Sequence, residues 1–159
     1  MNILFCFFSS CENSDILKLI IGSEPNRETI FVEESCLASV SPVFRAMLST
    51  ALSEQKTKII KIEDADMRAV EVLLDLCGVL AVPGARINSV QTAVGLLWLG
   101  QKYLIEEVEV PALLYLQQHL SLHTALYILQ HLHVLYDQFS GITNFIIQVF
   151  KIGTLSLLV

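Results

Sequence analysis

The feature that most constrains the fold of this chain is a change of hydrophobic period near residue 63. Before this point, short apolar runs rich in β-branched residues alternate with turn signals, as strands do. After it, apolar residues recur at intervals of three and four for the remainder of the 159 residues, which is typical of amphipathic helices. We therefore predict an α+β fold, in which a small three-stranded sheet packs on a helical cluster and extra C-terminal helices follow.

Three segments carry the strand pattern. The runs 15–21 and 29–32 flank a turn-rich stretch of Gly, Pro and Asn at 22–26, which predicts a hairpin with a longer loop. Residues 58–63 form the third predicted strand. Residues 1–14 are treated as a separate apolar N-terminal segment, whose aromatic residues suit either the core or a strand exchanged at a dimer seam; they are Phe5, Phe7 and Phe8.

Capping residues and the spacing of apolar residues predict where the helices begin. Ser41 can accept an orphan backbone N–H at a helix start, and Pro42 loses nothing at the first helical position. Phe44, Met47 and Leu48 then follow at i, i+3 and i+4, so they share one apolar face. A short helix at 34–40 precedes this one. Later starts are predicted at Asp66, at Asn88 or Ser89, near Pro111 and at Ser121, and the helix after Ser89 is expected to carry Val90, Ala93, Val94, Leu97, Trp98 and Leu104 on one side.

Charge and cysteine content exclude several classes of function. The net charge is −6 and the ten Lys and Arg residues are scattered, so there is no basic stripe to bind nucleic acid. The four cysteines, Cys6, Cys11, Cys36 and Cys77, have no CxxC spacing, which is typical of free thiols in a reducing compartment. We expect a cytoplasmic or nuclear protein.

Apolar surface is concentrated towards the C-terminus. Residues 103–150 contain no Lys or Arg, so much of this region must be hidden either in the core or against a partner. The apolar run 141–159 is interrupted by Asn144, Gln148 and Lys151, which makes it a weak membrane-span candidate. We expect no membrane span.

Candidate catalytic and metal-binding residues do not form a known pattern. His119 and His123 are four residues apart, but the predicted helix start at Ser121 separates them, and His131 and His133 would point to different helix faces. Asp64 and Asp66 are interpreted as loop and cap residues. No phosphate-binding glycine loop or nucleophile motif occurs, so we predict neither an enzyme nor a cofactor or metal site.

Four segments in series resemble a BTB/POZ domain over residues 15–120. Residues 15–16 open a strand hairpin, and 37–48 read LASVSPVFRAML, similar to the L-A-x-x-S-P-x-F-x-x-M helix pair of that family. Residues 60–64 (IKIED) resemble its strand ending in acid, and 96–104 (LLWLGQKYL) resemble its L-x-x-A-x-K/D-Y-L helix. The resemblance implies a small BTB/POZ-type sheet covered by helices.

The resemblance also implies a protein-interaction module that homodimerises. Many members are substrate adaptors of cullin-3 ubiquitin ligases and share an apolar-x-Glu triplet after the S-P-x-F helix, which here is Leu52-Ser53-Glu54. Burial of an exposed leucine in a partner pocket stabilises a complex by roughly 1.5–3 kcal/mol, and a carboxylate two residues on can accept a charge-assisted hydrogen bond. Phe44 and Met47 are the neighbouring positions expected to contact a cullin-3-type scaffold.

Departures from the family pattern support an alternative function. Glu33 stands where many members have His, residues 76–80 (LCGVL) replace a Y-x-Y-T-G signature, and 81–88 is longer than usual. The alternative is a BTB-type oligomerisation scaffold, such as a transcriptional cofactor or assembly domain, that does not bind cullin. Residues 121–159 resemble the start of a BACK-like helical extension, with helices expected at 121–136 and 142–152, and they suit a fragment, an isoform or a short family member.

Overall fold

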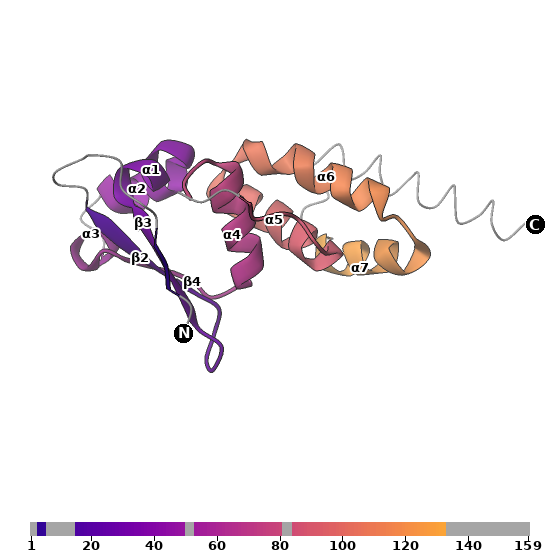
Figure 1. Ribbon diagram of the computed structural model, residues 1–159, viewed down its shortest axis with the longest axis horizontal. Helices are drawn as coiled ribbons and strands as arrows, with labels where there is room; N and C mark the ends of the chain where they lie inside the picture. The colour runs from indigo at the N-terminus through magenta and orange to yellow at the C-terminus, as the bar shows by residue number, and fades with distance from the viewer. Residues whose placement is uncertain (1–2, 6–14, 50–52, 81–83, 133–159) are drawn as a thin grey trace, which may run out of the picture.

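The computed structural model describes residues 3–5, 15–49, 53–80 and 84–132. Its strands form one mixed four-stranded sheet in the order β1-β3-β2-β4 (Figure 1). β2 and β3 pair antiparallel, while β1 lies parallel to β3 and β4 lies parallel to β2. The strands are β1 (Ile3–Phe5), β2 (Ile16–Ile21), β3 (Glu28–Glu33) and β4 (Ile59–Ile62).

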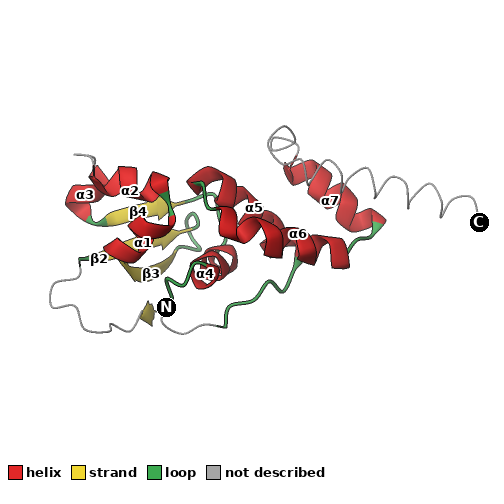
Figure 2. Cartoon of the chain, turned by 90° about the horizontal axis from the view of Figure 1, so that it is seen from above, coloured by secondary structure: helices red, strands yellow, loops and turns green. Residues whose placement is uncertain are grey.

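Helices make up the remainder of the fold. The sheet with α1–α3 lies at one end of the molecule and α5–α7 at the other, with α4 between them (Figures 1 and 2). This arrangement confirms the predicted α+β class. The helices are α1 (Glu34–Val40), α2 (Pro42–Ser49), α3 (Ser53–Thr57), α4 (Met67–Leu76), α5 (Val90–Tyr103), the 3-10 turn η1 (Glu106–Val108), α6 (Glu109–Gln118) and α7 (Leu122–Leu132).

The strand prediction was right for three strands and missed the fourth. The hairpin of β2 and β3 runs in register from Ile16 opposite Glu33 to Ile21 opposite Glu28. β1 is the addition, and it places Phe5 opposite Phe31 of the same chain. A three-residue strand is too short to show an alternating pattern, so the sequence did not indicate it. Phe7 and Phe8 lie outside the described residues.

One continuous core joins the sheet to the helices. Alternate residues of β2 are buried because successive side chains of a strand point to opposite faces. Apolar residues of α4 and α5 pack against one side of the sheet, and α2 adds the ring of Phe44. Side chains in this core include Leu17, Leu19, Ile30, Ile60, Phe44, Leu73, Leu96 and Leu97.

Helix starts follow the predicted capping residues. The side chains of Asp66, Ser89 and Ser121 accept backbone N–H groups at the starts of α4, α5 and α7, at 2.9, 3.0 and 3.1 Å. The end of α5 differs from the prediction, because Leu104 is not on the core face. It adopts φ 54° as the helix cap and its side chain is 57% exposed. The sharp turn lets Ile105 N–H reach the carbonyl of Gly100 at 2.8 Å.

Several predictions lie outside the described residues. They are the helix expected within 142–152, the apolar run 141–159 and His133. None of the helices in the described ranges is both long and apolar enough to cross a membrane.

Candidate protein-interaction site

The S-P-x-F segment joins α2 to the end of α5. The hydroxyl of Ser41 accepts the N–H of Phe44 at 3.1 Å and donates to the carbonyl of Tyr103 at 2.6 Å. The rings of Phe44 and Tyr103 stack with centroids 4.2 Å apart and 20° between their planes. On the outer side of α2, the Arg45 Nε–H donates to the carbonyl of Ala38 at 3.0 Å, which joins α2 to the end of α1. These contacts fix α2 firmly against the rest of the domain.

The position of Phe44 corrects the prediction that it contacts a scaffold. Its side chain is only 1% exposed, because it fills the core between the sheet and α5. A partner could not reach it without opening that core. Met47, one turn further along α2, is half-buried and therefore retains accessible surface.

The acidic residue of the predicted triplet lies at the start of α3. No helix was predicted here, but Ser53 and Glu54 begin a five-residue helix whose last residue is Thr57. Glu54 is half-buried, and its carbonyl accepts the N–H of Lys58 at 2.9 Å as α3 ends. Leu52 lies outside the described residues. The chain enters β4, an edge strand of the sheet, directly after α3.

Lys58 fixes the turn between α3 and β4. Its backbone adopts φ 55°, and its ammonium group pairs with Asp15 at 3.2 Å and with Glu34. The hydrogen bond to Glu34, together with that to Asp15, raises the pKa of Lys58 above its ordinary value and outweighs the effect of desolvation. Lys58 therefore ties the starts of β2, α1 and β4 together, and it sets where α3 projects from the sheet.

A second accessible surface lies on α1 and α2. Apolar side chains there are only half-buried although they pack on the core. Apolar side chains that pack on one side and remain accessible on the other are suited to a protein interface. Cys36 and Val40 are one turn apart on α1, as Val43 and Met47 are on α2, and we name these four residues the α1–α2 face.

A groove separates the β4–α4 loop from α5 and α7. Its volume is about 410 Å³, and we name it the α5–α7 groove. At its rim the carboxylate of Asp64 accepts the indole N–H of Trp98 at 3.3 Å and binds the ammonium of Lys102 at 2.6 and 2.7 Å. The lining residues are Asp64, Ala65, Asp66, Gln91, Val94, Gly95, Trp98, Tyr127 and His131.

These contacts determine the ionisation of the Asp64–Lys102 pair. Partial burial alone would raise the pKa of Asp64, but the hydrogen bonds from Lys102 and Trp98 outweigh it and leave the pKa below its ordinary value. Burial would similarly lower the pKa of Lys102, and the bond to Asp64 reverses that effect, so its pKa is raised. Both groups are therefore charged at neutral pH.

Sequence reasoning missed the groove for identifiable reasons. Asp64 was interpreted as a loop residue, and Trp98 was placed on the core side of its helix. The spacing of Trp98 and Lys102, four residues apart on one helix, could have indicated a common partner. Nothing in the local sequence indicates that the partner is Asp64, 34 residues before Trp98.

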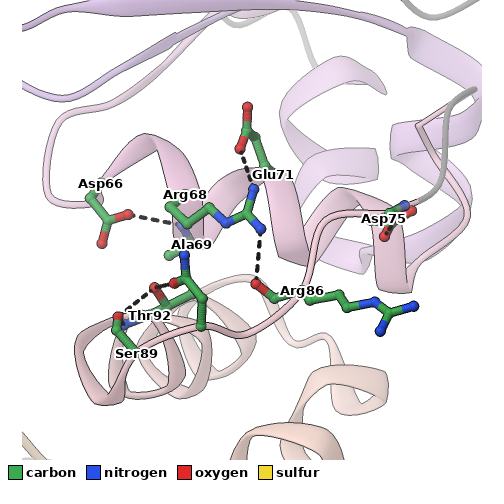
Figure 3. Close-up of polar contacts among 10 residues, drawn as sticks. Asp66, Arg68, Ala69, Glu71, Asp75, Arg86, Ser89 and Thr92 are labelled. Carbon is green, nitrogen blue, oxygen red and sulfur yellow. Dashed lines mark hydrogen bonds and ion pairs between the residues drawn. The ribbon is translucent and has the colours of Figure 1, made fainter.

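The connection between α4 and α5 is held by side chains of α4 (Figure 3). Arg68 pairs with Glu71 at 3.2 Å and donates to the carbonyl of Arg86 at 3.0 Å. At the other end of α4, Asp75 accepts the N–H of Gly84 at 3.0 Å. These bonds orient the backbone that leads into the cap at Ser89, so the helix lining the groove begins at a defined point.

Two histidines, His119 and His131, lie at the C-terminal ends of α6 and α7. His119 and His131 each lie within hydrogen-bond distance of a carbonyl four residues earlier, at 2.9 and 2.8 Å, and each stacks on a tyrosine ring. His123 is exposed on α7, beyond the cap at Ser121. Among the described residues, no three His, Cys, Asp or Glu side chains are placed to hold a metal ion together.

The sequence matches the family model of the BTB/POZ domain over residues 7–120. The chain therefore belongs to the BTB/POZ family and contains a protein–protein interaction module. A search of curated proteins finds no match. The matched region contains β2 to β4 and α1 to α6. The two segments 37–48 and 96–104, which resemble the family pattern, are in contact in the structure through Ser41 and Phe44 on one side and Tyr103 on the other.

Proposed function

We propose that this protein is a homodimerising substrate adaptor that binds a cullin-3-type scaffold and works in the cytoplasm or nucleus. Family membership supports an interaction module, and the accessible surface of α1, α2 and α3 supports this use of it. The observation that carries the proposal is the position of α3, which follows the firmly held α2 helix in the chain and has Glu54 as its second residue. A short helix beside an edge strand is a defined and accessible docking element.

The α1–α2 face supports the homodimer. Its four side chains are apolar and half-buried, and α1 and α2 are held together by the bond from Arg45 to the carbonyl of Ala38. A symmetric contact between two such faces would remove this apolar surface from water on both chains at once, at about 25 cal/mol per Å². Two copies could therefore associate through this face without any rearrangement of the core.

Sedimentation equilibrium of the full chain tests the dimer. We expect a mass of twice the 17.7 kDa of one chain. Val43→Glu should weaken association by about tenfold or more, because it would bury an unpaired charge at the contact. Leu126→Glu is the matched control, since Leu126 is 52% exposed on α7 and away from this face. A monomer at all concentrations, or equal weakening by both variants, would refute the proposed dimer contact.

The scaffold contact is assigned to Met47, Leu52, Ser53 and Glu54. Here Glu54 would accept a charge-assisted hydrogen bond, and Leu52 would enter an apolar pocket on the scaffold. Met47 would complete the apolar part of the surface, because its flexible side chain adapts to a partner's shape.

Calorimetric titration with the N-terminal domain of cullin-3 tests this contact. We expect Glu54→Gln to weaken binding by about tenfold and Leu52→Asp to abolish it. Glu28→Gln, which neutralises an exposed acid at the start of β3, should leave binding unchanged. If the wild-type dimer does not bind the cullin domain, the oligomerisation scaffold without cullin binding becomes the better function.

A further inference from the structure

The α5–α7 groove combines acidic and aromatic groups that come from three separate elements. Asp64 and Asp66 belong to the β4–α4 loop, Trp98 to α5, and Tyr127 and His131 to α7. Its volume of about 410 Å³ corresponds to the liquid volume of about fourteen water molecules, at ~30 Å³ each. The space is sufficient for a long side chain of a partner, together with part of its backbone.

The charge in the groove is not balanced. Both oxygens of Asp64 bind Lys102, so this carboxylate is already neutralised. Asp66 uses its Oδ1 to accept the N–H of Ala69 at 2.9 Å, and within the described ranges it has no ion-pair partner. Asp66 is an exposed residue that lines the groove, and no hydrogen bond occupies its Oδ2 among the described residues. One carboxylate oxygen is therefore accessible in the groove.

The aromatic groups favour a flat cation. The Tyr127 and His131 rings stack with centroids 4.0 Å apart, and Trp98 lines the groove from α5. Since the carbonyl of Tyr127 can only accept, the bond to His131 Nδ1 at 2.8 Å places a hydrogen on Nδ1. A guanidinium group can stack on aromatic faces while its N–H groups bind a carboxylate, whereas an ammonium group is a compact point charge.

We propose that the α5–α7 groove binds an arginine side chain of a partner polypeptide. The guanidinium stacks against Trp98 and Tyr127 and donates hydrogen bonds to Asp66 Oδ2. The net charge of −6 favours the approach of such a basic segment, and an anionic ligand would be repelled by the unpaired carboxylate of Asp66. This site goes beyond the proposed function, because it lies between α5 and α7 and requires neither a dimer nor a cullin scaffold.

Trp98 is the only tryptophan in the chain, so its fluorescence reports directly on the groove. The full chain is titrated with the capped peptide Ac-Ala-Leu-Arg-Leu-Ala-NH2 and with versions carrying Gln or Lys in place of Arg. We expect a saturable change with the Arg peptide, binding about tenfold weaker with Lys, and no saturable change with Gln. Equal responses to all three peptides, or no response to the Arg peptide, would overturn the proposal.

Two matched charge-neutralising substitutions, one at the N-cap of α4 and one near its C-terminal end, test whether the Arg peptide binds in the groove. Asp66→Asn keeps an oxygen that caps α4 but removes the charge, and it should weaken binding of the Arg peptide by about tenfold. Asp75→Asn removes the same charge from a residue that also accepts a backbone N–H, 3.0 Å away, but lies outside the groove. It should leave binding unchanged. Equal weakening by both variants would show a general effect of net charge and would refute the site.

Discussion

The two sides of α5 use similar residues for different purposes. On one side, Tyr103 stacks on Phe44 inside the core and its carbonyl accepts a buried hydrogen bond. On the other side, Trp98 and Lys102 reach the carboxylate of Asp64 at the rim of the α5–α7 groove. Both sides connect the helix to residues far away in the sequence. The difference between them is access to water.

Exposure decides what each set of contacts contributes. Ser41 is fully buried, so the loss of its hydrogen bonds would leave a carbonyl without a partner in a nonpolar setting, which is costly. The side chains of Lys102 and Asp64 are 38% and 43% exposed, so water can replace either one. The contacts of the core side therefore stabilise the fold. On the groove side, Asp64 and Lys102 can exchange each other for water or another partner with little loss of stability.

The largest expected effect comes from Phe44→Ala. Removing a fully buried aromatic ring should lower the free energy of unfolding by about 3–5 kcal/mol, a large part of the stability of an ordinary domain. Trp98→Ala, on the half-exposed side of the same helix, should cost no more than about half as much. Urea denaturation of both variants measures the difference. If Phe44→Ala does not fold, Phe44→Leu should still show a loss of about 1–2 kcal/mol.

Equal losses for Phe44→Ala and Trp98→Ala would break the comparison between the two sides. Such a result would mean that the groove side of α5 contributes to the fold as much as the core side does, and that the residues lining the groove are held too firmly to be available to a partner.

A smaller effect is expected for Ser41→Ala. The substitution removes the helix cap and leaves the Tyr103 carbonyl buried without its donor, so the free energy of unfolding should fall by about 2–3 kcal/mol. Ser89→Ala is the matched control, because Ser89 caps α5 but is only half-buried. It should cost about 1 kcal/mol. Equal costs would show that the buried bond to Tyr103 adds nothing beyond capping.

The fold was predictable from local patterns. The hairpin followed from alternating residues around a turn, and the starts of α4, α5 and α7 followed from Asp66, Ser89 and Ser121. The failures occurred where a local pattern was too short or was overruled. β1 has three residues, and Leu104 leaves the core face because α5 ends there with a left-handed turn.

The candidate site was harder to predict because it depends on distant contacts. The same pattern of apolar residues that correctly placed Phe44 on a helix face could not show whether that face met the core or a partner. Likewise, Asp64 became informative only after the fold had placed it beside Trp98 and Lys102. Spacing in sequence predicts which residues share a face, and only the tertiary structure shows what that face contacts.

The smallest expected effect concerns the ion pair on the groove side. Asp64→Asn should lower the free energy of unfolding at neutral pH by no more than about 1 kcal/mol, because the pair is partly solvated. The pKa of Asp64 is lower in the folded protein than its ordinary value of 3.8, so its contribution is fully present above that value. It is lost as the pH falls through the lowered pKa, where the folded carboxylate takes up its proton.

Urea denaturation of wild type and Asp64→Asn at a series of pH values from neutral down to about pH 2 measures this dependence. We expect the two proteins to differ at neutral pH and to converge in acid. Lys102→Met and the double variant Asp64→Asn/Lys102→Met complete the test. If the two groups act only on each other, the double variant should be as stable as the less stable of the two single variants. A difference that persists unchanged in acid would show that Asp64 stabilises the fold through its oxygen atoms as acceptors. The groove side of α5 would then be as structural as the core side.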